Sequence, residues 1–422
     1  MITSKVLNSG ARLVVDEMKG FEGVSFKLFI FVGSSNEKKE EDYGISHLIE
    51  HMFFKGTKTR SSFDIVKEFD KLGIQTNAYT SKTATCYFTY GTTETLEKSV
   101  EITSDMLFNS VYDETELERE KQVVLEEIKM YEDLPDSVCE ILMDSTFYNN
   151  LSYAHDILGT EKSVLNITRN QILDYLKENY IPKNIVLSFA GNVDFKTVEK
   201  LVNKYFESKF TTQSFFKYDP ITIDFAVEKK QNVVLKETNQ AQIKISYKTE
   251  NLFNEHKTRL NSLISAILGG GMSSRLFQEV REKLGLVYNI SSQNETSPIA
   301  GMFSIMFGST HKNIKLALKT IKNVIKNVVD NGFTQEELTQ AKNMLITNIK
   351  LQGDSPSNMA TRNAYQLQNN NRIISKEDLI NFYKNITIEE INIQAKNIFT
   401  QNYCITMVSS KTENLIEEYE NL

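Results

Sequence analysis

The fold is decided by residues 167–189, ITRNQILDYLKENYIPKNIVLSF, which align without a gap with residues 386–408, ITIEEINIQAKNIFTQNYCITMV. In both stretches, apolar residues at helical spacing precede a short apolar run. This order predicts a helix that leads into a strand in each half of the chain. The match is the first indication that one structural unit occurs twice.

Two further pairs of segments occur in the same order. Residues 84–91, ATCYFTYG, match residues 301–308, GMFSIMFG, as strands that close with glycine. Residues 117–135 match residues 338–356 as long helices, each stopped by a proline. Because the three pairs keep their order, they indicate a duplication. We therefore predict an α+β chain of two homologous domains, each with a mixed sheet and helices.

The predicted boundary between the two copies follows the last helix of the first half. Residues 211–220 lose periodicity and carry Thr, Gln, Ser and Pro, which is typical of a linker. We therefore place an N-terminal domain at residues 1–210, the linker at 211–220 and a C-terminal domain at 221–422. A chain of 422 residues is long enough for two or three domains.

Composition and charge limit the classes of function. The chain contains 40% hydrophobic and 24% charged residues, which is typical of a folded protein. Its formal net charge of −7 argues against a nucleic-acid partner. No apolar run reaches the roughly 18 residues needed to cross a bilayer, and no secretory signal is visible. Three widely spaced cysteines indicate reduced thiols, so we expect a cytoplasmic protein without membrane contact.

A pair of histidines indicates a metal site. Of the five histidines in the chain, two sit four residues apart with a glutamate between them, as His47-Leu48-Ile49-Glu50-His51. About 0.005 such motifs are expected by chance in this composition. On a helix, residues four apart lie on one face, so both imidazoles can reach one cation. Glu50 borders that face and suits a general base. The other histidines, expected at the surface or at helix ends, are His155, His256 and His311.

The third metal ligand is expected to be a carboxylate. A catalytic zinc normally has three protein ligands and one open position, and two histidines with one glutamate are a common set. The acidic helix predicted from about Glu114 to Asp133 is the best source. Most of its acidic residues form a solvated face. Spacing alone leaves three candidates open: Glu120, Glu126 and Glu127.

The motif and its surroundings resemble a known family. His-x-x-Glu-His is the inverzincin signature. The chain resembles the zinc metallopeptidase family of pitrilysin, insulin-degrading enzyme and mitochondrial processing peptidase. Its length is similar to the short, processing-peptidase-like branch. The segments that carry the resemblance are Gly44–Thr57, Asn77–Thr80, Val123–Ile128, Ile157–Thr160, Ala190–Val193 and Gly269–Tyr288.

The resemblance assigns the metal site more closely than the spacing does. In the family a glutamate on the long helix is the third zinc ligand, and the matching residue is Glu127. A second glutamate supports the site from behind the ligands, and the matching residue is Glu120. The resemblance thus implies Zn²⁺ held by His47, His51 and Glu127. It also implies a pitrilysin-like fold, in which the two domains enclose a cavity.

Further family residues concern the substrate. Arg281 and Tyr288 match an arginine and a tyrosine of the second domain that orient substrate and stabilise the tetrahedral intermediate. Asn77 and Ala78 match an edge strand to which an extended peptide adds as a further strand. These roles are what the resemblance implies. The residues alone would suggest only a surface cation, a core aromatic and a strand.

The second copy offers an independent check on the site. A structural stripe of histidine and glutamate would have no reason to disappear as a set, yet all of the proposed metal residues are replaced there. The equivalents are Ser262 for His47, Ser265 for Glu50, Ala266 for His51, Ala341 for Glu120 and Asn348 for Glu127. We infer that one half carries the metal and that the other shapes the substrate cavity.

The sequence therefore predicts a zinc-dependent endopeptidase that cleaves peptides or unfolded segments, such as those of precursor or leader peptides, with Glu50 as general base. The alternative is a non-catalytic binding or scaffold subunit of a processing-peptidase-like complex. Such subunits have typically lost ligands, and zinc content would discriminate the two. A catalytic subunit that needs a separate partner ranks lower, because Arg281 and Tyr288 are in the same chain. We expect a monomer or a homodimer.

Overall fold

The computed structural model describes residues 1–218 and 225–420, which form two compact units. Unit 1 comprises residues 1–129, 155–218 and 351–373. Unit 2 comprises the described residues of 130–154, 219–350 and 374–422. Each unit contains one mixed β-sheet with helices on both of its faces.

The units differ from the predicted domains 1–210 and 221–422 because each half gives one helix to the other unit. The helix α5 (Pro135–Tyr148), from the first half, belongs to unit 2, and α12 (Pro356–Asn370), from the second half, belongs to unit 1. Periodicity shows that a helix has an apolar face but not which sheet buries it. Of the predicted linker 211–220, residues 219 and 220 lie outside the described residues.

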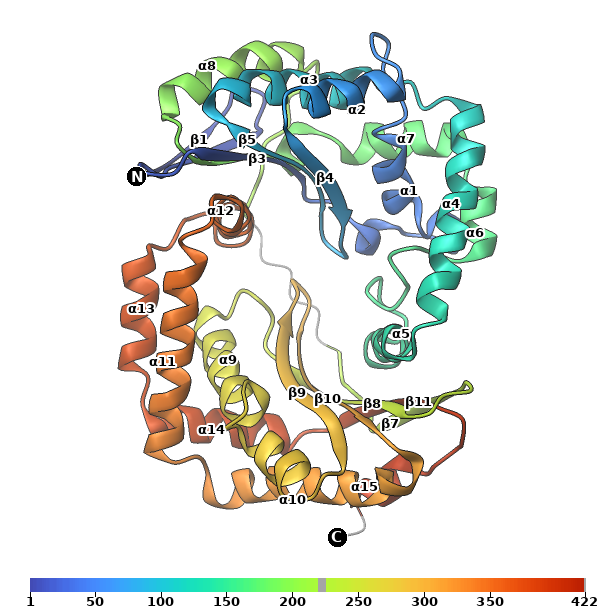
Figure 1. Ribbon diagram of the computed structural model, residues 1–422, viewed down its shortest axis with the longest axis vertical. Helices are drawn as coiled ribbons and strands as arrows, with labels where there is room; N and C mark the ends of the chain where they lie inside the picture. Colours follow the sequence, from blue (N-terminus) through green and yellow to red (C-terminus); the bar gives the residue numbers. More distant parts are fainter. Residues whose placement is uncertain (219–224, 421–422) are drawn as a thin grey trace. The chain divides into compact units, whose positions relative to one another are not determined.

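The sheet of unit 1 has six strands in the order β1-β2-β6-β3-β5-β4 (Figure 1). All neighbours are antiparallel except β2 and β6, which are parallel. This order places β4 at one edge of the sheet. The strands are β1 (Ile2–Val6), β2 (Arg12–Glu17), β3 (Gly23–Ile30), β4 (Gln75–Thr80), β5 (Thr85–Thr92) and β6 (Ile185–Gly191).

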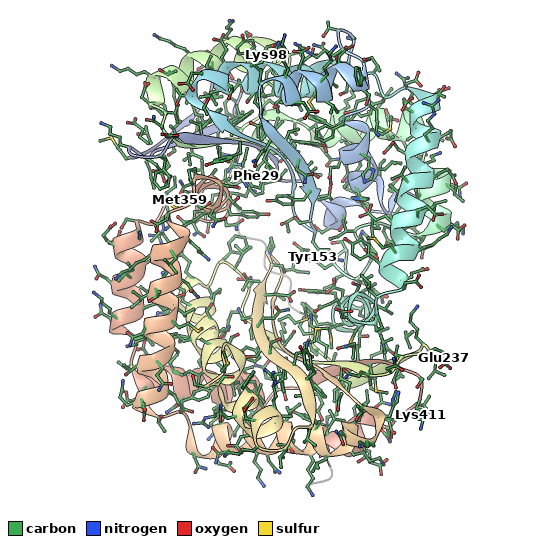
Figure 2. All side chains as sticks on the ribbon, in the orientation of Figure 1. Phe29, Lys98, Tyr153, Glu237, Met359 and Lys411 are labelled. Atoms are coloured by element: carbon green, nitrogen blue, oxygen red, sulfur yellow. The ribbon has the colours of Figure 1, made fainter. Side chains whose placement is uncertain are left out.

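Both faces of this sheet are buried because successive side chains of a strand point to opposite sides. Leu28 belongs to the core under α3 and α8, whereas Phe29 packs with Ala364 and Leu367 of α12. Figure 2 shows Phe29 and Met359 at the interface between the sheet and α12.

The other helices of unit 1 are α1 (Ile45–Met52), α2 (Ser62–Lys71), α3 (Leu96–Asn109), most of α4 (Glu114–Glu132), α6 (Glu161–Asn166), α7 (Arg169–Asn179) and α8 (Phe195–Tyr205), with short turns η1 (Ser34–Asn36), η2 (Glu40–Asp42), η3 (Thr93–Thr95), η4 (Pro182–Asn184) and η5 (Glu207–Lys209).

Within its described residues, unit 2 repeats the topology of unit 1 with one strand fewer. Its order, β7-β11-β8-β10-β9, corresponds to β2-β6-β3-β5-β4, with the same parallel pair and the same antiparallel pairs. The predicted duplication is therefore confirmed. The strands are β7 (Lys230–Leu235), β8 (Ala241–Thr249), β9 (Val287–Thr296), β10 (Gly301–Ser309) and β11 (Tyr403–Ser409). The helices are α9 (Glu255–Gly269), the π-helix η6 (Phe277–Glu282), η7 (His311–Asn313), α10 (Ile314–Asn331), α11 (Gln335–Gln352), α13 (Lys376–Asn385), α14 (Ile388–Phe399) and α15 (Leu415–Glu420).

The cysteines are all buried free thiols, namely Cys86, Cys139 and Cys404. Cys86 lies within an apolar strand, as expected of a small core residue. None of the helices in the described residues has the length and apolar character needed to cross a membrane.

A buried carboxylate fixes the start of α1, the helix that carries the histidine motif. Glu37, which is 1% exposed, accepts the backbone N–H of Gly44 at 2.9 Å and that of Ser46 at 3.0 Å. Gly44 has φ 90°, a conformation that favours glycine. His155 holds Glu37 in turn, with 3.1 Å between its Nε2 and the carboxylate, and stacks on Tyr43 with ring centroids 3.8 Å apart. Of the two expectations for His155, a place at the surface or at a helix end, the surface is wrong, because the side chain is 8% exposed and supports the carboxylate at the start of α1.

This arrangement predicts a large stability cost when Glu37 is removed. Glu37→Ala leaves two buried N–H groups at the start of α1 without an acceptor, so we expect unfolding to require about 3 kcal/mol less free energy. Glu41→Ala removes an exposed carboxylate that pairs with the exposed Lys39 and serves as the control, with an expected change below about 0.5 kcal/mol. Urea unfolding followed by circular dichroism measures both. Equal midpoints for the two variants would contradict the prediction.

Candidate metal centre

The two histidines of the motif lie on one face of α1, as their spacing predicts. Their ring centroids are 4.6 Å apart, and His47 is buried while His51 is partly exposed. The opposite side of the helix is held in the core by Leu48, Ile49 and Met52, all of which are fully buried. The rings are therefore presented from a helix that is anchored along its apolar side.

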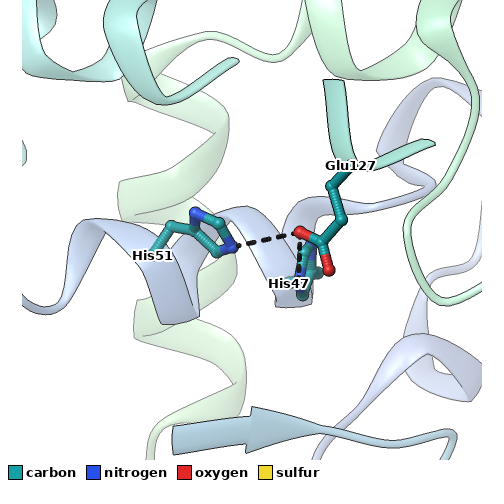
Figure 3. A group of neighbouring side chains, drawn as sticks. All are labelled: His47, His51 and Glu127. Atoms are coloured by element: carbon teal, nitrogen blue, oxygen red, sulfur yellow. Dashed lines mark ion pairs between the residues drawn. The ribbon is translucent and has the colours of Figure 1, made fainter. Parts of the chain in front are cut away.

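Glu127 of α4 completes a group of three potential ligands (Figure 3). Its Oε2 lies 3.7 Å from His47 Nε2 and 3.6 Å from His51 Nε2. Donor atoms around a tetrahedral zinc, with bonds of about 2.1 Å, lie about 3.4 Å apart. The donor set and its spacing therefore fit a zinc ion. Among the described residues, this is the one group of three or more such side chains whose ligand atoms converge within 4.8 Å.

The other two carboxylate candidates are placed differently. Glu126 has 75% of its side chain exposed and pairs with Lys129 along the helix. Glu120 is buried and contacts His51 from behind, with 3.1 Å between its Oε2 and His51 Nδ1. It also pairs with Lys55 at 2.6 Å. Lys55 was not singled out from the sequence, although it lies four residues after His51.

Glu120 determines which nitrogen of His51 faces a metal. The Nδ1–H of His51 donates a hydrogen bond to the carboxylate of Glu120. The other ring nitrogen, Nε2, therefore faces Glu127. This is the arrangement in which a carboxylate orients a metal-binding histidine. In His47, by contrast, Nδ1 is buried and has no hydrogen-bond partner among the described residues.

The pKa values of the two imidazoles are shifted in opposite directions when no metal is bound. Burial, aided by the neighbouring His51, lowers the pKa of His47 to about 4. Burial alone would also lower the pKa of His51, but hydrogen bonds to Glu120 and Glu127 outweigh it and raise the pKa to about 9. The hydrogen bond from His51 lowers the pKa of Glu127. At neutral pH, His51 is therefore positively charged and His47 is neutral. A cation that binds both rings must displace one proton, from His51.

Glu50 lies beside the ligand group without belonging to it. Burial raises the pKa of its carboxyl, and the hydrogen bond from Thr80 opposes that effect. The Thr80 Oγ1 donates to Glu50 Oε2 over 2.5 Å. A carboxylate with a raised pKa accepts a proton more readily than an ordinary glutamate does. Thr80 is a second residue that was missed, because nothing in its position along the sequence links it to Glu50.

Asn77 and Ala78 lie on β4, the edge strand of unit 1. Among the described strands, β4 pairs with β5 alone, so its other edge carries unpaired backbone groups to which a strand could add. An open groove of about 740 Å³ runs beside this strand. Among its lining residues are Phe54, Val66, Ile74 and Asn77. The groove therefore combines apolar side chains with the free edge of a strand.

Arg281 and Tyr288 lie in unit 2, whereas the three ligand candidates lie in unit 1. Arg281 is on η6 and Tyr288 on β9. The guanidinium carbon lies 4.4 Å from the Phe277 ring centroid and 5.8 Å from that of Tyr288. Tyr288 is 77% exposed, so it is not the core aromatic that its residue type alone would suggest. The structure thus brings these two residues together, and their role toward substrate stays a prediction.

At the equivalent place in unit 2, small side chains replace the ligands. Ser265 Oγ donates to the backbone oxygen of Ser292 on the edge strand β9, and Ser292 Oγ donates back to that of Ser265. Ala266 and Ala341, which replace His51 and Glu120, line a cavity of about 110 Å³. The frame of the site is kept, but no group in it could hold a metal with three side chains among the described residues.

Two family models match the chain. The model for insulinase (peptidase family M16) matches residues 13–161, and the model for the peptidase M16 inactive domain matches residues 166–345. Solved structures share the fold. A peptidase M16 inactive domain from Pseudomonas fluorescens has a TM-score of 0.88 at 19% identity and covers 98% of each chain. A protease from Helicobacter pylori has a TM-score of 0.87 at 23% identity, covering 97% of this chain and 99% of that one.

Relatives of similar length are named as zinc proteases. The uncharacterized zinc protease YmxG of Bacillus subtilis is 34% identical over 418 residues, which cover 97% of this chain and 98% of that protein. An uncharacterized zinc protease of Rickettsia felis is 31% identical over 395 residues, covering 93% and 94%. With the family models and these relatives spanning nearly all of its length, the chain belongs to peptidase family M16, the insulinase family.

Proposed function

We propose that this protein is a zinc-dependent endopeptidase that cleaves peptides or unfolded segments. The observation that carries the proposal is the convergence of His47, His51 and Glu127 within 4.8 Å, with the half-buried carboxylate of Glu50 on the same helix as the two histidines. The names of the relatives support it, because they are called zinc proteases. His47, His51 and Glu127 would hold the ion, and Glu120 would orient His51.

The residues of unit 1 suit a hydrolytic reaction. Bound zinc would act as a Lewis acid and make water a nucleophile at neutral pH. Glu50 accepts a proton from the attacking water and later gives it to the leaving amine, which requires a carboxyl with a raised pKa. Arg281 and Tyr288 are the proposed donors to the oxyanion that develops on the scissile carbonyl.

The proposed substrate is an extended peptide that adds to β4 along Asn77 and Ala78. Backbone hydrogen bonds to an edge strand require an unfolded partner, which would exclude folded proteins. The groove beside β4 offers apolar side chains to such a peptide. A cytoplasmic location remains part of the proposal, supported by the three free thiols. A role in peptide processing, and a monomeric or homodimeric state, also remain predictions.

Removal of the general base should abolish cleavage and leave the metal in place. For Glu50→Gln we expect kcat to fall by at least about 10²-fold while bound zinc stays near one per chain. A peptide library analysed by mass spectrometry, with and without chelator, measures cleavage, and elemental analysis measures zinc. Glu126→Gln is the control, because that exposed side chain contacts no ligand. A wild-type chain that cleaves nothing would contradict the proposal, and the absence of bound zinc would in addition favour the non-catalytic scaffold.

Zinc binding should release about one proton at pH 7.5. The pKa of His51 is raised to about 9 in the metal-free site, so His51 is protonated there, whereas His47, with a pKa of about 4, is already neutral. Zinc affinity should therefore rise about tenfold per pH unit from pH 7 and level off near pH 9. Titration calorimetry in two buffers of different ionisation enthalpy counts the proton. Zero release at pH 7.5 would contradict a protonated His51.

Loss of the carboxylate behind His51 should weaken zinc binding. Glu120→Gln removes the charge that orients His51, and we expect the zinc Kd to rise about 10–100-fold. Competition with a fluorescent chelator measures this constant. Glu118→Gln, on the exposed side of the same helix, provides the matched control and should leave the Kd within about twofold. Equal affinities for the two variants would show that Glu120 does not support the site.

A further inference from the structure

The carboxylate proposed as general base is held from the edge strand that would receive the substrate. Thr80, the last residue of β4, donates its hydroxyl to Glu50 Oε2 over 2.5 Å. This is the one hydrogen bond made by the Glu50 side chain within the described residues. We propose that Thr80 is a positioning residue, which fixes the carboxylate of Glu50 for proton transfer. The inference rests on the function proposed above and adds a residue to it.

The hydroxyl limits both the position and the role of the carboxylate. An ionised carboxylate only accepts hydrogen bonds, so Thr80 must be the donor. The bond occupies Oε2 and leaves Oε1 to receive a proton from water. Glutamate has three rotatable side-chain bonds, and a base that samples several rotamers spends less time in the reactive geometry. A hydroxyl fixed at 2.5 Å restricts that sampling.

The backbone around Thr80 is fixed by the same segment that fixes α1. Ser34 donates its N–H to the backbone oxygen of Ser81 at 3.2 Å, and Ser35 donates to that of Lys82 at 2.9 Å. Glu37, three residues after Ser34, caps the first turn of α1. Gly33 allows the close approach, since a Cβ there would lie 2.1 Å from the Ser81 oxygen. The segment 33–37 thus binds both the residues that follow Thr80 and the first turn of α1, the helix that carries Glu50.

The position of Thr80 also connects substrate binding with the base. A peptide that adds to β4 forms hydrogen bonds with its backbone and reduces the motion of that strand. Because the Thr80 side chain is attached to this strand, occupancy of the edge orders the donor to Glu50. The effect of losing the hydroxyl should therefore appear in kcat, not in KM.

The competing explanation is that Thr80 only stabilises the end of the β4–β5 hairpin. Ser81 provides a matched control for it. Its Oγ donates to the backbone oxygen of Ala84 at 3.0 Å and accepts the N–H groups of Thr83 and Ala84, so it closes the hairpin turn without contacting Glu50. Ser81→Ala should weaken the turn and leave the base in place.

The test compares Thr80→Val, Thr80→Ser and Ser81→Ala as zinc-loaded full-length proteins, on a peptide that the wild type cleaves. For Thr80→Val, which keeps the shape but removes the donor, we expect kcat to fall by about tenfold or more, with KM and zinc content within about twofold. Thr80→Ser, which restores a donor, should recover most of the loss. Ser81→Ala should leave kcat within about twofold. An unchanged kcat in Thr80→Val, or an equal loss in Ser81→Ala, overturns the positioning role.

Crystal structures of the two Thr80 variants give a readout that does not depend on activity. The Glu50 carboxylate should leave its position in Thr80→Val and keep it in Thr80→Ser; an unmoved Glu50 in Thr80→Val overturns the inference. The two proposals fail differently. A zinc-loaded wild type that cleaves no peptide overturns the proposed function and the role of Thr80 with it. An active wild type with an equally active Thr80→Val overturns only the latter.

Discussion

The fixed separation between α1 and α4 is the constraint on which the candidate site depends. Two ring nitrogens of α1 and one carboxylate oxygen of α4 must lie within a few ångströms, and neither helix alone could supply all three. α1 has only eight residues, too few to be stable by itself, so its position comes from its buried apolar side and from Glu37 at its first turn. The geometry of the candidate site is thus a property of the packing of unit 1.

The two copies of the fold show which structural features do not depend on the candidate metal ligands. Arg60 follows α1 and binds Glu68, Glu101 and Asp105, while its aligned counterpart Arg275 follows α9 and binds Glu337. Both units therefore anchor the chain after the equivalent helix with a partly buried arginine, although the acidic partners differ. The ligand positions are small or neutral in unit 2. Helix placement is shared by both copies, and the candidate metal ligands occur in one.

Much of this could be predicted from the sequence because the signals are local. The spacing of His47 and His51 places both on one helical face, and the repeated order of helix and strand indicates two related sheets. Residues that act across long distances in the sequence were not predictable in this way. Thr80 and Glu50 meet through the packing of α1 against β4, and His155 meets Glu37 over more than a hundred residues. No periodicity encodes such contacts, so they appear only in three dimensions.

The exchange of α5 and α12 has a consequence for the independence of the two halves. A polypeptide ending at residue 210 would lack α12 and would expose Val14, Phe29 and Cys86 on one face of its sheet to water. A polypeptide beginning after that point would lack α5, whose Met143 and Phe147 pack with Met302. Large bare apolar faces drive association. Neither half covers both faces of its own sheet, and each depends for that cover on a segment encoded in the other.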